Sequence, residues 1–381
     1  MHRRRLLGML AGCACGTSLA PRLLGGALRA QDAIDFAMPG GEPAVGLAPA
    51  RFGEPLPGGE ILCRLCPREC RIADMARGYC GVRENRRGEF FTLVHGRVCS
   101  LHADPIEKKP FFHFLPGTDA LSLATPGCNL ACRFCQNWQI SQFRPEQVPT
   151  RAASPEALLR AARDQGAPTL AYTYSEPTIF YEYMRDIAAY TAPRGIRNVV
   201  VSNGYIQERP LRELAPHLSA YKVDLKAFTE EFYARQCNAE LAPVLATLET
   251  LKSIGLWMEI VVLVIPTLND DEASNQAMFR WIRATLGPEV PLHLTRFHPT
   301  YKILNLPRTP VPTLERLHAL ARAEGLHYVY IGNAPGHPTE STYCPGCGAR
   351  VIERYGYVIG AIALDAGRCR GCGHPIPGVW S

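Results

Sequence analysis

The stretch TPGCNLACRFCQNWQIS, residues 125–141, carries the pattern that decides the fold of this chain. Its three cysteines, Cys128, Cys132 and Cys135, follow the apolar, strand-like run ALSLAT (120–125) in a Cys-x3-Cys-x2-Cys spacing. Thiolates this close in sequence can converge on one metal centre, whereas the cysteines of a disulfide scaffold would be scattered along the chain. The stretch therefore predicts a metal-binding loop at the end of a β-strand.

The number of thiolates indicates which metal centre this loop holds. A [4Fe–4S] cluster is normally bound by four cysteines, so three ligands leave one iron with an open position. An open position is what a catalytic metal centre needs in order to bind a small molecule. A zinc site completed by a fourth ligand from elsewhere in the chain is the alternative for the same spacing.

The segments that follow predict an α/β fold. Strand-like runs lie at 120–125, 168–173, 197–201, 220–224, 257–264 and 291–297, with helical patterns between them at 154–166, 177–191, 208–217, 240–254 and 271–286. A further helix at 312–324 and a strand at 326–331 are expected at the edge. This alternation predicts βαβ units and a parallel sheet, and we expect a partial (βα)6-type barrel. No Gly-x-Gly-x-x-Gly follows the first strand, which disfavours a dinucleotide-binding fold.

A barrel places its active site at the C-terminal ends of its strands, and polar residues fall at those positions here. The three cysteines follow the first expected strand, and the other strand ends carry Ser175-Glu176-Pro177, Ser202-Asn203, Asp224-Leu225-Lys226, Ile265-Pro266 and Arg296-Phe297-His298. We therefore expect these residues to share one rim with the metal centre.

Residues 60–335 resemble a known family of enzymes. The stretches CRLCPRECRI (63–72), GYCGVREN (78–85), DPIEKKPFFHFLPG (104–117) and TPGCNLACRFCQNWQIS are similar to those of AmmeMemoRadiSam-system radical S-adenosylmethionine (SAM) enzymes, relatives of pyruvate formate-lyase activating enzymes. The resemblance implies a partial barrel, a [4Fe–4S] cluster, and reductive cleavage of SAM to methionine and a 5′-deoxyadenosyl radical that abstracts hydrogen from a substrate. It also implies a reducing electron donor, and Memo-like and AMMECR-like proteins as possible partners, but no particular substrate.

The resemblance also implies roles for the residues at the rim. Phe134 and Asn137 lie within the cysteine motif beside the cofactor, and the Ser175-Glu176-Pro177 run corresponds to the family's Gly-Gly-Glu-type motif, which holds the methionine amino group. Tyr174 and Ser175 stand where glycines are usual, which is a departure from that motif. The remaining expected contacts are the ribose contacts Ser202 and Asn203, the acidic–basic pair Asp224 and Lys226, the adenine-lining Val264 and Pro266, and His298 near the substrate.

Two further cysteine groups flank the core. Cys63, Cys66, Cys70 and Cys80 offer four thiolates for a closed zinc site or a second four-ligand cluster. Cys344, Cys347, Cys369 and Cys372 form two Cys-x2-Cys-Gly knuckles on either side of a β-hairpin pattern, which predicts a zinc-ribbon-like segment. The ribbon is expected to stabilise the fold or to dock a partner. Cys237 is expected to be a buried apolar residue.

The first thirty residues differ from the rest of the chain in charge. They hold five arginines, among them Arg3, Arg4 and Arg5, and no acidic residue, so most of the formal net charge of +6 lies there. The remainder is almost neutral and gives no support for nucleic-acid binding. The arginines precede an apolar run (6–20) that is short for a spanning helix and resembles a twin-arginine signal. This leader suggests the periplasm or cell envelope, and the alternative is the cytoplasm.

The chain of 381 residues, with 47% hydrophobic and 20% charged residues, has the composition of a globular protein, not a disordered or fibrous one. We expect a leader (1–31), a linker (32–58), an N-terminal four-cysteine metal-binding segment (59–115), the core (116–335) and the zinc-ribbon-like segment (336–381). Two alternatives to a radical SAM enzyme of unknown substrate remain. One is an activase that generates a glycyl radical on a partner protein, and the other is a non-enzymatic, zinc-rich interaction module.

Overall fold

The computed structural model describes residues 46–381, and the account of the fold concerns these residues. The predicted leader, the first part of the predicted linker (32–45), Cys13 and Cys15 lie outside them. Among the described residues, no helix combines the length and the apolar character needed to cross a membrane.

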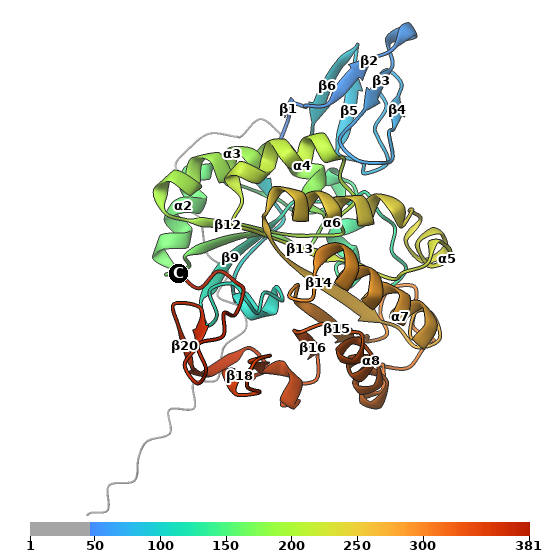
Figure 1. Ribbon diagram of the computed structural model, residues 1–381. Helices are drawn as coiled ribbons and strands as arrows, with labels where there is room; N and C mark the ends of the chain where they lie inside the picture. The colour runs from blue at the N-terminus through green and yellow to red at the C-terminus, as the bar shows by residue number, and fades with distance from the viewer. Residues whose placement is uncertain (1–45) are drawn as a thin grey trace, which may run out of the picture. The chain divides into compact units, whose positions relative to one another are not determined.

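The core is one eight-stranded sheet with the order β16-β15-β14-β13-β12-β11-β9-β8 (Figure 1). Seven of its strands run parallel: β9 (Asp119–Ala124), β11 (Thr169–Tyr172), β12 (Arg197–Ser202), β13 (Ala220–Asp224), β14 (Trp257–Val264), β15 (Leu292–Arg296) and β16 (Val329–Gly332). These confirm the predicted strands and the predicted parallel sheet. β8 and β16 are the two edges, so the sheet is open.

The helices follow the strands in turn. They are α2 (Pro155–Asp164), α3 (Tyr181–Thr191), α4 (Glu208–Leu214), α6 (Ala242–Ile254), α7 (Glu272–Trp281) and α8 (Val311–Ala323), together with the short α1 (Trp138–Ser141) and α5 (Glu230–Phe232). The parallel strands succeed one another across the sheet in chain order, and right-handed crossovers then place every connecting helix on the same face. Figure 1 shows the helices on that outer side, which leaves the opposite face free to form a site.

The antiparallel edge strand β8 (Ser100–Pro105) was not predicted. It pairs with β9 from Ser100 opposite Ala124 to Pro105 opposite Asp119. Residues 100–105 were expected to belong to the N-terminal metal-binding segment, and they instead extend the core sheet. Their sequence, SLHADP, lacks the continuous apolar run of a strand buried on both faces, because an antiparallel edge strand does not need one.

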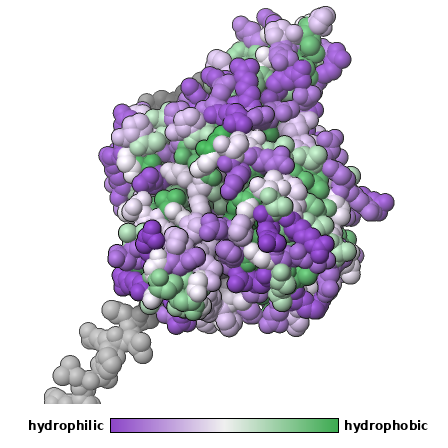
Figure 2. Space-filling view, in the orientation of Figure 1, coloured by the Kyte–Doolittle hydropathy of each residue, from purple (hydrophilic) through white to green (hydrophobic). Residues whose placement is uncertain are grey.

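The N-terminal module comprises residues 46–98 and contains two small antiparallel sheets. One has the order β1-β6-β5 and the other β2-β3-β4, with β1 Ala48–Pro49, β2 Gly53–Pro55, β3 Ile61–Cys63, β4 Arg71–Ile72, β5 Arg83–Arg86 and β6 Glu89–Thr92. Residues 46–58 of the predicted linker therefore contribute β1 and β2, because their extended Gly- and Pro-rich backbone pairs at the sheet edges. The face of this module seen in Figure 2 is largely hydrophilic.

The N-terminal module is held to the core by buried polar contacts. The Arg83 side chain is 2% exposed and forms an ion pair with Glu182 of α3 at 2.8 Å. The Glu182 carboxylate also accepts a hydrogen bond from the Arg51 backbone N–H at 2.7 Å. The Gln207 N–H, just before α4, donates to the Leu65 carbonyl at 3.1 Å. These contacts fix the N-terminal module against the helices after β11 and β12.

The C-terminal segment contains the predicted hairpin. Strands β17 (Thr342–Tyr343), β18 (Arg350–Tyr355) and β19 (Val358–Ile362) form one antiparallel sheet, and β20 (Leu364–Asp365) pairs with β21 (Arg368–Cys369). Val351 and Ile352 pack in one buried cluster with Phe112 and Tyr330 of the core. The Arg354 guanidinium crosses the same boundary and donates to the Phe112 carbonyl at 2.5 Å. The segment is thus part of the hydrophobic core at this edge of the sheet.

Candidate active site

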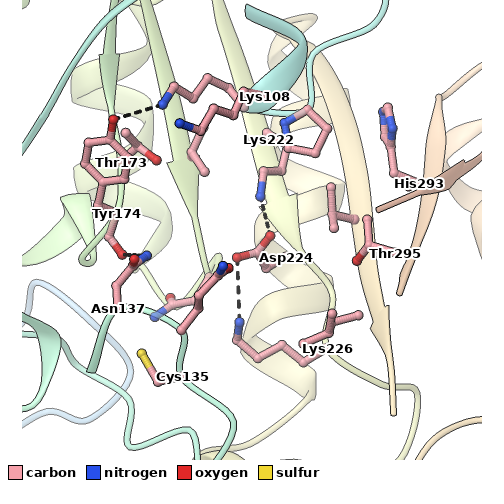
Figure 3. Close-up of a pocket in the computed structure, with 18 of the residues that line it drawn as sticks. Lys108, Cys135, Asn137, Thr173, Tyr174, Lys222, Asp224, Lys226, His293 and Thr295 are labelled. Carbon is pink, nitrogen blue, oxygen red and sulfur yellow. Dashed lines mark hydrogen bonds and ion pairs between the residues drawn. The ribbon is translucent and has the colours of Figure 1, made fainter. Parts of the chain in front are cut away.

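One cavity of about 540 Å³ lies at the C-terminal ends of the parallel strands. It falls within the usual size range of ligand pockets. Most predicted site residues line it: Cys128, Cys132, Phe134, Cys135, Asn137, Ser175, Glu176, Asn203, Asp224 and Lys226. Parallel strands end at one edge of a sheet, so residues about a hundred positions apart in sequence meet there. Figure 3 shows Asp224 and Lys226 in this cavity, with Cys135 to the left of Lys226.

The cysteine loop is held in place by hydrogen bonds on both sides. The Leu130 N–H donates to Cys128 Sγ at 3.4 Å, and the Asn137 backbone N–H donates to Cys135. Backbone amides aimed at sulfur are typical of sites where thiolates bind metal. Within residues 46–381, the sulfurs of Cys128, Cys132 and Cys135 do not all lie within 4.8 Å of one another. Such separation fits a cluster, in which each thiolate binds a different iron, and not a single zinc ion.

Cys237 is a neighbour of the cysteine loop that the sequence did not indicate. It is buried, as expected, but it lies in the π-helical turn Tyr233–Cys237, whose backbone pairs with the cysteine loop: the Ala131 N–H donates to the Cys237 carbonyl at 3.0 Å. Its thiol forms a hydrogen bond with Cys132, which is the main reason why the pKa of Cys132 lies below the usual thiol value. Burial raises the pKa of Cys237 well above that value, so Cys237 stays a thiol and acts as the donor.

Glu176 organises the strand ends beside Cys128. Its carboxylate accepts hydrogen bonds from the Thr178 N–H (2.9 Å), the Thr178 hydroxyl (2.7 Å), the Ser202 hydroxyl (2.7 Å) and the Asn203 N–H (2.9 Å). Burial raises the pKa of Glu176, although these four donors oppose the shift. Asn203 also approaches Cys128 Sγ, at 3.9 Å from its Nδ2 atom. The predicted residue Ser202 therefore supports Glu176 instead of lining the cavity itself.

Tyr174 adopts the backbone conformation that glycine usually provides. Its φ is +64°, in the left-handed region that costs a non-glycine residue energy. The Asn137 side-chain amide donates to the Tyr174 carbonyl at 2.8 Å. The Tyr174 phenol lies between the Asp104 carboxylate and the Lys109 amine, with Lys109 Nζ 3.2 Å from the phenol oxygen. Tyr174 thus replaces the glycine of the motif but keeps a glycine-like backbone conformation, because the contacts of its carbonyl and of its phenol hold the residue in place.

The predicted acidic–basic pair is a triad in the structure. Asp224 contacts Lys222 through one carboxylate oxygen and Lys226 Nζ through the other, the latter at 3.7 Å (Figure 3). Burial alone would raise the pKa of Asp224, but the two lysines outweigh it and hold that pKa below its usual value. Sequence reasoning missed Lys222 because it lies inside strand β13, two residues before the strand end.

A second wall of the cavity comes from residues outside the predicted rim. Glu107 and Lys108 of the 3-10 turn Ile106–Lys108, together with Lys109, face the cavity from the side of β8. They belong to the stretch DPIEKKP, so the resemblance that singled out this stretch was a usable signal. Gly356 and Tyr357, in the turn between β18 and β19, reach the cavity from the C-terminal segment, and no sequence pattern indicated them.

Five predicted contacts are not among the cavity-lining residues: Pro177, Ser202, Val264, Pro266 and His298. Val264 and Pro266 are buried elsewhere, and Val261 and Leu263 face the cavity from β14 in their place. Successive side chains of a strand point to opposite faces, so Val264 lies on the face of β14 opposite to Val261 and Leu263. His298 lies beyond the end of β15 and is exposed, whereas His293 and Thr295 of that strand line the cavity. Pro177 begins the turn Pro177–Phe180 that positions Glu176 as its N-cap.

The C-terminal cysteines converge more closely than Cys128, Cys132 and Cys135 do. Sγ atoms of Cys344, Cys347, Cys369 and Cys372 all lie within 4.8 Å of one another, with Cys344–Cys372 at 3.6 Å and Cys347–Cys369 at 3.8 Å. The glycine after each knuckle has a positive φ, +74° at both Gly348 and Gly373, as the tight turns require. This group could hold a single metal ion.

Comparisons with known proteins agree with this site. Residues 122–275 match the Radical SAM superfamily. An uncharacterised protein of Methanocaldococcus jannaschii is 45% identical over 329 residues, which is 86% of this chain and 98% of the relative. The benzylsuccinate synthase activating enzyme of Thauera aromatica is 24% identical over 42% of this chain and 53% of its own length. The isethionate sulfite-lyase activating enzyme of Desulfovibrio desulfuricans is 30% identical over 36% of this chain and 43% of its own length.

The match to the family covers the cysteine loop, the Glu176 turn and the Asp224 triad. It contradicts the non-enzymatic alternative, because the matched superfamily is one of enzymes. Together with the relative that is similar over nearly its whole length, it shows that this chain is an enzyme of the radical SAM superfamily.

Proposed function

We propose that this enzyme is of the AmmeMemoRadiSam type and that its 540 Å³ cavity binds SAM beside a [4Fe–4S] cluster held by Cys128, Cys132 and Cys135. The observation that carries the proposal is the meeting of these cysteines with Glu176, Asn203 and the Asp224 triad in one cavity. A zwitterionic ligand with a sulfonium group needs carboxylates, cations and apolar walls together. Val261 and Leu263 supply such an apolar wall.

The chain's own residues bind and orient the cofactor in this proposal. Glu176 receives four protein hydrogen bonds, which fix its carboxylate next to Cys128 and let it define where the methionine amino group lies. Asp224 stays ionised between Lys222 and Lys226, so it offers a fixed negative charge for the sulfonium. Lys226 keeps its positive charge, because Asp224 and Cys132 outweigh its burial and raise the pKa of Lys226 well above the usual value.

The bound cluster and SAM supply reductive cleavage to a 5′-deoxyadenosyl radical, which abstracts hydrogen from the substrate. The polypeptide contributes by keeping this chemistry away from water. Phe134 is 6% exposed and packs on Phe232 with ring centroids 5.7 Å apart, which closes the cavity behind the cysteine loop. The substrate is expected to enter from the side of Lys108, which lies at the end of the cavity away from Cys135 (Figure 3).

Anaerobic reconstitution with iron and sulfide, followed by reduction in the presence of SAM, tests this function. We expect 5′-deoxyadenosine by mass spectrometry from the wild-type protein and none from a C128A/C132A/C135A variant. Equilibrium dialysis of the reconstituted protein should show weaker SAM binding for Asp224→Asn. The matched control Asp164→Asn changes an exposed carboxylate near the end of α2 and should bind as the wild type does. Equal binding by all three proteins would remove the Asp224 triad from the proposed SAM site.

A second candidate function is the activation of a partner enzyme. Two relatives are activating enzymes, of benzylsuccinate synthase and of isethionate sulfite-lyase, and this chain matches about half of each or less. An activase would need a partner polypeptide that presents a glycine to the cavity. Anaerobic turnover with candidate partners, followed by electron paramagnetic resonance for a glycyl radical on the partner, distinguishes this function from chemistry on a small molecule.

We infer that the C-terminal cysteine group binds zinc. Tetrahedral coordination with Zn–S bonds of about 2.3 Å places the sulfurs roughly 3.8 Å apart. The sulfur pairs at 3.6 and 3.8 Å agree with that separation before any ion is considered. Metal analysis of a variant that lacks Cys347 and Cys372 should show one zinc fewer per chain than the wild type.

The remaining expectations concern the cellular setting. We propose that a low-potential reductant serves as electron donor, that Memo-like and AMMECR-like proteins are partners, and that the basic leader exports the enzyme to the periplasm or cell envelope. Co-purification under anaerobic conditions tests the partners. Cell fractionation with and without the Arg4→Lys and Arg5→Lys substitutions tests the export, because a twin-arginine signal depends on that pair.

A further inference from the structure

The N-terminal cysteines surround one small cavity, although they come from three separate turns. Cys63 ends β3, Cys66 follows it, Cys70 precedes β4 and Cys80 precedes β5, and all four line the same cavity. A backbone hydrogen bond from the Cys63 N–H to the Cys70 carbonyl, at 2.9 Å, brings the first and third turns together. The four thiols therefore face a shared space.

Each of these thiols receives a backbone amide. The donors are Leu65 to Cys63, Arg68 to Cys66, Tyr79 to Cys70 (3.4 Å) and Val82 to Cys80. Three of the donors lie two residues after the cysteine, as Leu130 does for Cys128 in the catalytic loop. Amides directed at sulfur stabilise thiolate ligands of metal centres, so the turns are built for bound thiolates and not only for packing.

Arg83 gives an independent indication of an anionic ligand set. Its side chain lines the same cavity and is almost fully buried, and its two terminal nitrogens bond to Glu182 and to the Arg51 carbonyl. Its Nε atom is buried without a hydrogen-bond partner among the described residues. An unpaired buried guanidinium donor is costly, and a negatively charged metal–thiolate centre beside it would offset that cost.

The separation of the sulfurs distinguishes a single ion from a cluster. A tetrahedral zinc ion draws four thiolates to about 3.8 Å from one another, as in the C-terminal group. Within residues 46–381, no three of the N-terminal sulfurs lie within 4.8 Å of one another as a set, and the same holds for the catalytic trio. Wider separation is what a [4Fe–4S] cluster requires, because each thiolate then binds a different iron.

We propose that Cys63, Cys66, Cys70 and Cys80 bind a second [4Fe–4S] cluster, with all four irons ligated by protein. This cluster lies beside the catalytic loop. A Cβ added to Gly127 would come within 2.9 Å of the Cys80 carbonyl, and the Arg68 guanidinium donates to the Asn129 carbonyl. Residues on both sides of Cys128 thus contact the N-terminal module, which makes the two cluster sites neighbours. With four protein ligands the second cluster has no open position, so it is not a second site for SAM.

Metal and sulfide analysis of the C128A/C132A/C135A variant tests the proposal in the full-length chain without the catalytic cluster. After anaerobic reconstitution with ferrous iron and sulfide, we expect about four irons and four sulfides per chain, and a cluster signal in electron paramagnetic resonance after reduction. Adding Cys66→Ser and Cys70→Ser to that variant should remove the iron. Zinc in place of iron in the triple variant would overturn the proposal.

A measurement in the intact catalytic background covers the case that the triple variant fails to fold. The wild-type protein should bind about eight irons and the C66S/C70S variant about four. Four irons in both proteins would overturn the second cluster and leave the proposed function unaffected, because the catalytic trio would account for all of the iron. Failure to form 5′-deoxyadenosine in a wild-type protein that binds eight irons would overturn the proposed function and leave the second cluster unaffected.

Discussion

The N-terminal and C-terminal cysteine groups offer four thiolates each, yet they are different sites in three dimensions. In the C-terminal group, two Cys-x2-Cys turns face each other across a hairpin and bring all four sulfurs within 4.8 Å. In the N-terminal group, three turns of different length hold the thiols around a cavity and keep them farther apart. The number of cysteines therefore indicates a metal site, and we expect the separation of their sulfurs to distinguish a single ion from a cluster.

The two groups also differ in how they meet the core. The C-terminal group packs in a buried cluster with Phe112 and Tyr330, and its hairpin turn places Tyr357 in the active-site cavity. The N-terminal group contacts the outer helices through Arg83 and the cysteine loop through Arg68. We therefore expect the C-terminal group to hold the cavity wall around Tyr357 in place, and the N-terminal group to hold the loop that carries Cys128, Cys132 and Cys135 in place.

The largest effect is expected from Cys132→Ala, in the catalytic trio that stands between the two groups. This substitution removes a cluster ligand, so 5′-deoxyadenosine formation should fall to the level of the protein-free reaction. The zinc content should stay at the wild-type value, because the C-terminal sulfurs form a set of their own that includes none of the trio. Product analysis and metal analysis of the same sample check both expectations. Retained 5′-deoxyadenosine formation would show that the trio is not the catalytic centre.

Cys369→Ala should reverse the pattern. Structural zinc contributes many kcal/mol to small domains, so loss of one ligand should destabilise residues 336–381 by several kcal/mol. Limited proteolysis should then cut within this segment, while the iron content stays close to that of the wild type. If Cys369→Ala and Cys132→Ala lose iron to the same extent, the separate roles of the two groups are wrong.

Glu107→Gln should change how stability depends on pH at the boundary of the C-terminal group. Burial is the main cause that raises the pKa of Glu107 to about 7; the Gly117 amide and Arg354 oppose the shift, and Glu259 adds to it. The stabilisation from the protonated carboxyl is complete below the unfolded value of 4.5 and is lost as the pH rises through 7. The wild type should therefore lose roughly 3 kcal/mol relative to the variant over this range.

Thermal or denaturant unfolding between pH 4.5 and 8 measures that difference. The control Glu249→Gln alters an exposed carboxylate of α6 and should follow the wild-type pH dependence. Parallel curves for the wild type and Glu107→Gln would mean that Glu107 is ionised in the folded protein.

The smallest effect is expected from Cys237→Ala, which tests whether the catalytic cluster keeps an open iron. The Cys237 thiol donates a hydrogen bond to Cys132, and removing this thiol leaves a small cavity. The free energy of unfolding should therefore fall by about 1 kcal/mol. The iron content should not change, and the reduced cluster should still show a change in its paramagnetic resonance spectrum when SAM is added. Loss of the cluster in this variant would identify Cys237 as a fourth ligand and contradict an open position.

Much of the fold was predictable because the parallel strands are buried on both faces and form continuous apolar runs, such as 257–264 in β14. The edge strand β8 was not, since SLHADP carries no such run. The meeting of the three loop cysteines with Glu176, Asn203 and Asp224 in one cavity was predictable from their positions after strands. Val264 was chosen in place of Val261 because a sequence shows the alternation of a strand but not which of its faces points to the site.

The sequence by itself determined where metal-binding cysteines gather, the order of the βα units and the strand ends at which the cavity lies, because these depend on residue type and spacing along the chain. Only the tertiary structure decided that Lys222 joins Asp224, that Cys237 lies beside Cys132, and that Tyr357 lines the cavity. These contacts join residues whose proximity depends on how whole strands and turns pack. The same reason separates the two four-cysteine groups, since the distance between sulfurs is set by the packing of the turns that carry them.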